Sequence, residues 1–230
     1  MVDEPSESET SANIAVIGAG WWSQGWHLPC LDRNPHVNLV AIVDKFSHPT
    51  SSLNPSLESL ESLGGRYGTR IFSSVDDLMK DEVSLGLDGV LIATPHATHY
   101  SVAKSVLSEG REKPLNVLME KPMSTDIQHA IDLYNLIQHQ QAGAASDKCG
   151  AFWINHSANF RTQTKLARET IASGRIGRIR HVTAFFASPL MWIFDDPGNR
   201  GWNEPTEGMI GNGESCCGCY QHFFSFNIRS

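Results

Sequence analysis

The sequence predicts an α/β fold in which helices cover a parallel sheet, followed by a smaller α+β region. Apolar runs of strand length recur between residues 13 and 120, and stretches long enough for helices separate them. Near-continuous apolar character is typical of strands that are buried on both faces, as they are in a parallel sheet. The alternation of the two kinds of segment indicates an α/β fold.

The predicted strands of this first domain are the apolar runs at residues 14–17, 37–43, 89–93 and 115–119. Helices are predicted in the intervening stretches. Ser73 and Ser74 precede Val75 and Asp76 in a capping pattern, which predicts a short helix that ends near Lys80. Residues 47–63 contain six Ser and two Pro, so only residues 57–63 are expected to be helical there.

Two longer helices are predicted from apolar residues at helical spacing. The first covers residues 98–109 and is closed by Gly110, because glycine favours a helix C-terminus. The second covers residues 125–141. Its predicted apolar face consists of Ile127, Ala130, Ile131, Tyr134 and Ile137.

The sequence pattern changes after Cys149. Residues 151–156 read as a strand, 164–173 as a helix closed by Gly174, and 179–187 as a strand with alternating character. These elements predict the start of an α+β domain. The expected organisation is a disordered leader at 1–12, a first domain at 13–148, a partial second domain at 149–213, and a tail at 214–230 without a clear period.

Composition excludes several classes of protein. Hydrophobic residues make up 40% of the chain and charged residues 19%, which is typical of a globular protein. The net charge of −7, without a basic cluster, argues against nucleic-acid binding. The longest apolar stretch, 184–194, is shorter than the roughly 20 residues that cross a bilayer, so no membrane association is expected. The five Cys and the absence of a targeting signal indicate a cytoplasmic location without disulfides.

The strongest local motif is the glycine-rich turn after the first strand. Gly18 allows a tight turn, and Gly20 allows a pyrophosphate oxygen to approach the main chain at the start of a helix. The third position of this pattern, usually Gly or Ala, is Ser23, which is expected to loosen the packing of helix on strand. Pro29 indicates that the helix begins or kinks near residues 27–29. The motif predicts a dinucleotide site, with an ordinary strand-to-helix turn as the alternative.

Asp44 ends the next predicted strand, 24 residues after Gly20. A carboxylate at this place accepts hydrogen bonds from the hydroxyls of the adenosine ribose and repels a 2′-phosphate. This favours NAD over NADP. Lys45 follows directly and would weaken the preference, so NADP stays open.

Two further motifs follow predicted strands, at the edge where open α/β sheets bind ligands. They are Thr94-Pro95-His96-Ala97-Thr98-His99 and Glu120-Lys121-Pro122. Together with the glycine turn and the run Gly-Arg-Ile-Gly at 174–177, they make residues 13–213 resemble the glucose–fructose oxidoreductase, inositol dehydrogenase and rhizopine-catabolism (Gfo/Idh/MocA) family. The resemblance implies a Rossmann-type parallel sheet domain followed by an α+β substrate domain. That second domain binds a sugar, polyol or cyclitol and often drives formation of a homo-oligomer.

The resemblance also implies roles for residues at the strand ends. It makes Lys121 the active-site lysine, placed between the nicotinamide ribose and the substrate hydroxyl, where it stabilises a developing alkoxide; a solvated surface lysine is the alternative. The bond from Lys121 to Pro122 is expected to be cis. His96 and His99 either touch the coenzyme or cap the next helix. The predicted coenzyme contacts are Gly18, Gly20, Trp21, Trp22, Ser23, Asp44, Thr94, Pro95, His96, His99, Glu120 and Pro122.

Polar residues of the second domain cluster where the resembled family turns from its first strand into its first helix. They are Asn155, His156, Asn159 and Arg161. Asn159 and Arg161 are the candidates for contact with substrate hydroxyls. Surface hydrogen bonding and helix capping are the alternative.

The resemblance stops near Gly213. Family members are usually much longer and carry a catalytic His in an Asp-Gly-His pattern, which residues 214–230 do not contain. Cys216, Cys217, Cys219 and His222 lack the spacing of a zinc site, so no metal is expected. The sequence thus predicts an NAD(P)-dependent oxidoreductase in truncated form. The alternative is a catalytically inactive nucleotide-binding protein that acts as a sensor or interaction partner.

Overall fold

A computed structural model describes residues 11–51, 54–107, 114–143 and 150–182 of the chain. They contain a six-stranded sheet of order β3-β2-β1-β4-β5-β6, in which every neighbouring pair is parallel. This order is that of a Rossmann fold, and it places a topological switch point between β1 and β4. The predicted parallel-sheet fold is therefore confirmed. The strands are β1 (Ala12–Ile17), β2 (Val37–Val43), β3 (Arg70–Phe72), β4 (Gly89–Ile92), β5 (Asn116–Glu120) and β6 (Phe152–Asn155).

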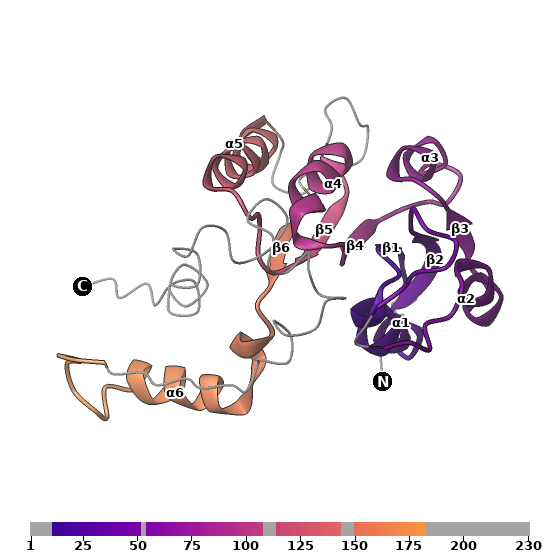
Figure 1. Cartoon of the computed structure of the whole chain (residues 1–230). Coiled ribbons are helices and arrows are strands. Elements are labelled where there is room, and N and C mark those ends of the chain that lie inside the picture. The colour runs from indigo at the N-terminus through magenta and orange to yellow at the C-terminus, as the bar shows by residue number, and fades with distance from the viewer. Residues whose placement is uncertain (1–10, 52–53, 108–113, 144–149, 183–230) are drawn as a thin grey trace, which may run out of the picture.

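Helices cover both faces of the sheet (Figure 1). On one face, Leu28 of α1 and Leu63 of α2 are buried against Val16 and Ile42. On the other face, the buried residues of α3, α4 and α5 pack with those of β1, β4 and β5. The helices are α1 (Leu28–Asp32), α2 (Leu60–Tyr67), α3 (Val75–Lys80), α4 (His99–Val106), α5 (Ile127–Gly143) and α6 (Thr162–Ala172), with short turns η1 (Ser23–His27), η2 (His96–Thr98) and η3 (Ser157–Phe160).

Serine side chains set the starts of two helices. Ser74 accepts a hydrogen bond from the backbone N–H of Asp77 and begins α3, as its capping pattern predicts. Ser59 accepts from Ser62 N–H and begins α2, which starts later than predicted and continues to Tyr67. The prediction ended α2 too early because the helix runs on through two glycines. The sequence also missed β3, since this edge strand has three residues, two of them exposed.

The strand expected to open a second domain belongs to the first sheet. β6 pairs in parallel with β5 along Val117 to Glu120, so this part of the predicted division at residue 149 is wrong. Phe152 and Ile154 pack against the core, whereas Trp153 is 65% exposed on the other face. Only one face of β6 is therefore covered by the core.

The predictions for the two ends of the chain agree with the structure only in part. β1 begins at Ala12, which was assigned to the leader. The predicted strand at 179–187 has no strand structure in its described part, 179–182, although the helix before it is present as α6. Residues 1–10 of the leader, the residues after 182 and the tail lie outside the described residues.

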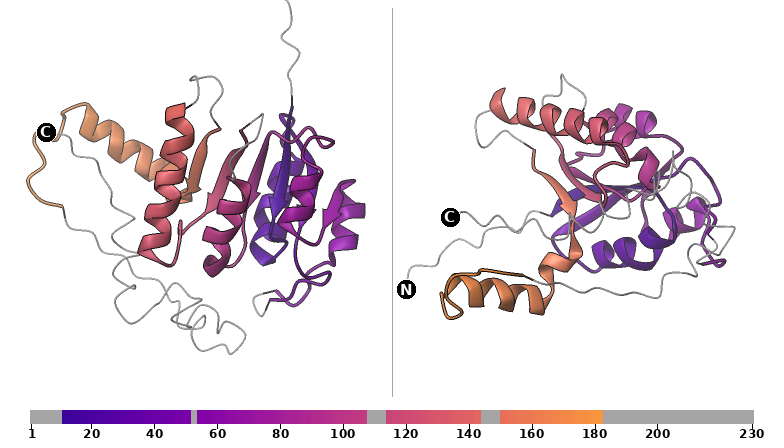
Figure 2. Two further views of the ribbon diagram at one scale, coloured as in Figure 1. Left: turned by 90° about the horizontal axis from the view of Figure 1, so that it is seen from above. Right: turned by 60° about the vertical axis from the view of Figure 1, so that its left-hand side comes forward.

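The buried face of α5 differs from the prediction. Leu133 is fully buried, while Ile127, Ile131 and Tyr134 are 81%, 46% and 58% exposed. Of the predicted face, Ala130 is half-buried and Ile137 packs against the core, so the prediction is right at these two positions and wrong at the other three. In Figure 2, α6 projects away from the sheet, and its Leu166 is exposed. In the described part of the chain, no helix combines the length and apolar character needed to span a membrane.

Candidate functional site

The glycine turn lies between β1 and the helical segment that follows, against the end of β4. Gly18 has a φ of +100°, and a Cβ atom built on it would lie 2.5 Å from Ala93 O. Only glycine fits this place, because a side chain would meet both an unfavourable φ and the neighbouring strand. A Cβ atom on Gly20 would meet no described atom within 4 Å. The turn is therefore closed against β4 at Gly18 and open at Gly20.

Ser23 closes this turn instead of loosening it. Its side chain is fully buried, and its hydroxyl donates a hydrogen bond of 2.5 Å to Gly18 O. The expectation that Ser23 weakens the packing is wrong, because the hydroxyl finds a backbone partner at the site that a smaller residue would leave empty. The chain then forms the π-helical turn η1 and passes into α1 at Leu28, with Pro29 in its first turn, in agreement with the change expected there.

Gln24 was not found from the sequence, and it braces the same turn. Its side-chain NH₂ group donates to Ala19 O at 2.9 Å and to Glu58 O at 3.1 Å, and its side-chain oxygen accepts from Glu58 N–H at 2.9 Å. These bonds connect the turn to the loop before α2. No local motif marks a glutamine for such a role, since its partners are backbone groups distant in sequence.

Asp44 lies at the end of β2 beside the turn. Its Oδ2 atom accepts a hydrogen bond from Ala19 N–H at 2.8 Å, and its Oδ1 atom accepts from Phe46 N–H at 2.9 Å. Each carboxylate oxygen has a further lone pair, so both can still accept from a ligand hydroxyl. The Lys45 amine lies 4.7 Å from the centre of the exposed Phe46 ring.

Thr94 follows β4 at the same edge of the sheet. Its hydroxyl is buried, and it has no hydrogen-bond partner among the described residues. Buried hydroxyls are normally paired, so an unpaired one beside an open glycine turn suits a ligand that supplies the missing partner. Pro95 is exposed, and its carbonyl oxygen accepts from the backbone and hydroxyl of Thr98.

His99 joins the loops that follow β4 and β5. Its ring is fully buried, with Nδ1 2.6 Å from Pro122 O and Nε2 3.0 Å from Thr94 O. Burial lowers the pKa of His99, and the two carbonyl contacts partly oppose this effect. Both ring nitrogens thus face backbone carbonyl oxygens of the protein. His99 therefore fits neither the capping role nor a direct contact with a ligand.

His96 lies next to His99, with their ring centres 5.6 Å apart. Burial, followed by the nearby His99 and Lys121, lowers the pKa of His96 to about 3. The ring is therefore neutral near pH 7. A histidine with so low a pKa is a poor proton acceptor in this pH range.

Glu120 receives hydrogen bonds from three distant side chains. Its Oε1 atom lies 2.9 Å from Trp22 Nε1, 2.9 Å from His27 Nε2 and 2.8 Å from Asn155 Nδ2. Its Oε2 atom accepts from Lys121 N–H at 3.3 Å. Burial alone would raise the pKa of Glu120, but the hydrogen bonds from His27, Trp22 and Asn155 outweigh it and lower the pKa to about 2. We call these four side chains (Trp22, His27, Glu120 and Asn155) the Glu120 cluster.

Lys121 and Pro122 come next in the chain. The bond between them is cis, as the resemblance implies, and both residues are half-buried.

Trp22 has its ring centre 5.1 Å from that of Trp21 and 5.8 Å from that of Trp26, which is 57% exposed. The turn, the ends of β4 and β5 and this aromatic surface therefore meet at the carboxyl edge of the sheet.

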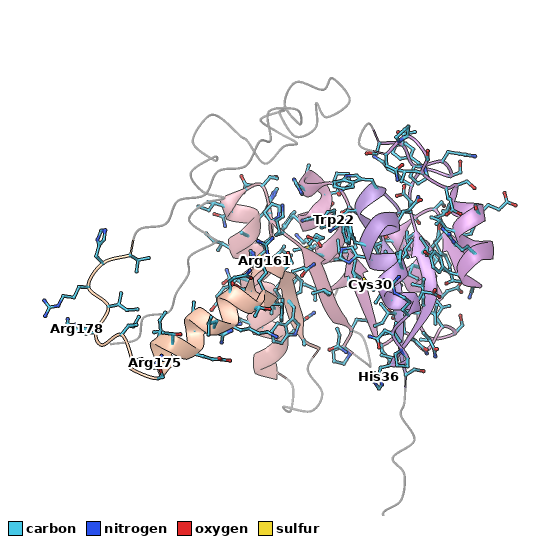
Figure 3. The ribbon with its side chains drawn as sticks, turned by 90° about the horizontal axis from the view of Figure 1, so that it is seen from below. Trp22, Cys30, His36, Arg161, Arg175 and Arg178 are labelled. Atoms are coloured by element: carbon cyan, nitrogen blue, oxygen red, sulfur yellow. The ribbon has the colours of Figure 1, made fainter. Side chains whose placement is uncertain are left out.

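The two candidate substrate residues are not part of the Glu120 cluster, although the nearby Asn155 is. Asn159 in η3 and Arg161, which directly precedes α6, are exposed, and Figure 3 shows Arg175 and Arg178 still further from the sheet. In the described part of the chain, no group of three His, Cys, Asp or Glu side chains could hold a metal ion. Cys216, Cys217, Cys219 and His222 lie outside the described residues.

Comparison with known proteins identifies a matching family and several related oxidoreductases. The oxidoreductase family with an NAD-binding Rossmann fold, Gfo/Idh/MocA, matches residues 12–146. An uncharacterised oxidoreductase of Synechocystis is 23% identical over 202 residues, which cover 87% of this chain and 46% of the relative. The D-xylose 1-dehydrogenase [NADP(+)] of Haloarcula marismortui is 20% identical over 194 residues, covering 84% and 48%.

Solved structures share the fold. Scyllo-inositol dehydrogenase from Lactobacillus casei, with bound NAD(H) and scyllo-inositol, superimposes with a TM-score of 0.57 at 22% identity. The match covers 74% of this chain and 43% of that one. The chain thus spans about half the length of the curated relatives it matches.

Proposed function

Because the chain belongs to the Gfo/Idh/MocA oxidoreductase family, whose matched part is an NAD-binding Rossmann fold, we propose that its glycine turn binds a nicotinamide coenzyme for the oxidation or reduction of a sugar, polyol or cyclitol. The observation that carries the proposal is the turn itself. It is closed at Gly18, open at Gly20 and braced by Ser23. The buried hydroxyl of Thr94, which has no partner within the described part of the chain, lies at the end of the adjacent strand.

The coenzyme's diphosphate is placed over Gly20, where the first N–H groups of a helix have no partner within that helix. Asp44 then accepts hydrogen bonds from the adenosine ribose, which favours NAD. The relative from Haloarcula is named for NADP(+), and the Lactobacillus enzyme was crystallised with NAD(H). Lys45 stands beside Asp44 as the cation that a 2′-phosphate would meet.

Chemistry at the carboxyl edge of the sheet is assigned to Lys121. A bound nicotinamide coenzyme would supply the acceptor or donor of a hydride at the carbinol carbon, and the hydroxyl proton would pass to or from a base. The Lys121 ammonium stabilises the negative charge that develops on the substrate oxygen. The carboxylate of the preceding residue, Glu120, accepts hydrogen bonds from protein side chains. This favours a role in supporting Lys121 over direct contact with the coenzyme.

A polyhydroxylated substrate is proposed on the strength of the relatives. One is named for D-xylose, and another was crystallised with scyllo-inositol. Contacts of Asn159 and Arg161 with substrate hydroxyls, a partial second domain after the sheet, a homo-oligomer formed through that domain and a cytoplasmic location stay predictions.

A second candidate function is coenzyme binding without turnover. It is favoured by His96 and His99 beside the candidate site, since the low pKa of His96 and the two carbonyl contacts of His99 make both unsuited as the base. Turnover of polyols by the purified chain, lost in Lys121→Met, would exclude this candidate. Absence of turnover together with tight NADH binding would support it.

Fluorescence titration with NADH and NADPH tests the coenzyme site. We expect Gly20→Asp to weaken binding at least about tenfold, because the carboxylate occupies the open space and repels the diphosphate. Gly65→Asp is the matched control, since Gly65 is exposed on α2 and a Cβ there also meets no described atom within 4 Å. Equal affinity of Gly20→Asp and wild type would exclude the turn as the binding site.

A further inference from the structure

We propose that Glu120 is a positioning residue for Lys121: the Glu120 cluster holds the helical segment after the glycine turn against the strand end that carries the lysine. This inference rests on the proposed function, because it assigns the cluster a role toward a coenzyme bound on that turn. The hydrogen bonds that support it join side chains within the part of the chain that the structure describes.

The cluster joins three segments that are distant in sequence. Trp22 and His27 follow β1, Glu120 ends β5 and Asn155 ends β6, and the contacts span 98, 93 and 35 residues. Their partner is a single oxygen atom of Glu120. Hydrogen bonds to a charged carboxylate are short and strong, so three of them fix the relative position of the segments.

The carboxylate is enclosed by the protein. The side chain of Glu120 is 11% exposed and that of His27 is 13% exposed. A buried carboxylate is stable only when hydrogen bonds replace its water, and the three side chains supply them. All three of these contacts fall on Oε1.

Lys121 is held through its backbone on both sides. Its own N–H donates to Oε2 of Glu120, at 3.3 Å. On its other side, the carbonyl oxygen of Pro122 lies 2.6 Å from His99 Nδ1. The lysine side chain therefore starts from a backbone that is tied to the glycine-turn segment through Glu120 and to the β4 loop through His99. The distance between Lys121 and a coenzyme bound at the turn would therefore be fixed.

A double-mutant cycle on NADH affinity tests this role in the full chain. The four proteins are wild type, Glu120→Gln, Lys121→Met and the combination of both. Glu120→Gln keeps the shape of the side chain but removes its charge. We expect Lys121→Met to weaken NADH binding about tenfold and Glu120→Gln to weaken it about threefold to tenfold. In the Lys121→Met background, Glu120→Gln should have no further effect, because the residue it positions is gone.

A purely structural role gives a different result. Glu120→Gln would then weaken NADH binding by the same factor with and without Lys121, and that additivity would overturn the proposal. Glu61→Gln, on the exposed surface of α2, is the matched control and should bind as wild type. A wild type that does not bind NADH would overturn the proposed function together with this inference, whereas binding with additive effects would overturn the inference alone.

Two further measurements keep the test decisive if Glu120→Gln fails to fold. Asn155→Ala and Trp22→Phe each remove one hydrogen-bond donor and leave the Glu120 carboxylate in place. NADH affinity is then measured in the same double-mutant cycle, with each of these variants combined with Lys121→Met. The indole N–H of Trp22, assigned in a ¹⁵N spectrum by its loss in Trp22→Phe, should shift in Asn155→Ala and on NADH addition. An indole signal that responds to neither change would show that the cluster is not coupled to the coenzyme site, and would also overturn the proposal.

Discussion

The Nδ1 atom of His99 lies 2.6 Å from the carbonyl oxygen of Pro122, although the two residues are 23 positions apart in the chain. His99 begins α4, and Pro122 follows the lysine at the end of β5. The ring contacts Thr94 O with its other nitrogen. One buried imidazole thus connects the two loops that carry the candidate site residues.

Replacing His99 should destabilise the protein substantially. In His99→Ala, a cavity replaces a fully buried ring, and two carbonyl groups lose their contact, which we expect to cost about 2–4 kcal/mol of unfolding free energy. Urea denaturation followed by circular dichroism measures the loss. His139→Ala, at an exposed position of α5, should change stability by less than about 0.5 kcal/mol. Equal midpoints for the two variants would contradict the bridging role of His99.

Gly18 and Gly68 form a matched pair for the backbone of the turn. Both have positive φ, +100° and +61°, but a Cβ on Gly18 would lie 2.5 Å from Ala93 O while one on Gly68 would meet no described atom within 4 Å. Gly68→Ala should therefore lower the free energy of unfolding by about 1 kcal/mol, because alanine is strained in the left-handed conformation. Gly18→Ala should cost at least about 3 kcal/mol, because the turn or β4 must also move. Thermal unfolding distinguishes them, and similar losses would mean that the turn adapts.

Much of the sheet could be predicted because burial on both faces leaves continuous apolar runs in the sequence. β2 matches its prediction, and α3 begins at the serine that caps it. β3 was missed because a short, half-exposed edge strand has no such run. β6 was found as a strand but assigned to the wrong sheet, since strand pairing depends on contacts that no local pattern records.

The candidate site was predictable where backbone geometry restricts the residue type, and less so elsewhere. Gly18 was found because few residues fit a tight turn at a strand end. The partners of Glu120 were not found, because Trp22, His27 and Asn155 reach it from separate segments. Ser23 was expected to be a defect, yet its hydroxyl has a buried backbone partner. Such pairings depend on the folded arrangement of the chain.

Glu120 should make stability depend on pH in acid. Its folded-state pKa of about 2 lies below the ordinary value of 4.5, so its stabilising contribution is fully present above about pH 5 and is lost as the pH falls from there toward 2. The maximum contribution is roughly 3 kcal/mol, and about 1.4 kcal/mol is lost for each pH unit in that range. Urea unfolding of wild type and Glu120→Gln at pH 7, 5 and 3.5 should give a difference that is constant down to pH 5 and smaller at pH 3.5. A difference that is the same at all three pH values would place the carboxylate in an ordinary, solvated environment.

Asp44 should decide between the two forms of the coenzyme. In Asp44→Ser, a hydroxyl that can accept a hydrogen bond remains beside the turn, but the negative charge beside the ribose is removed. We expect NADH affinity to fall about threefold to tenfold and NADPH affinity to rise, which changes their ratio at least about tenfold. Adding Lys45→Ala should reduce the gain for NADPH, because the cation nearest the 2′-phosphate is then lost. Titration of both coenzymes measures the ratio, with Asp32→Ser, at an exposed carboxylate that ends α1, as the matched control. An unchanged ratio in Asp44→Ser would mean that the ribose does not lie against this carboxylate.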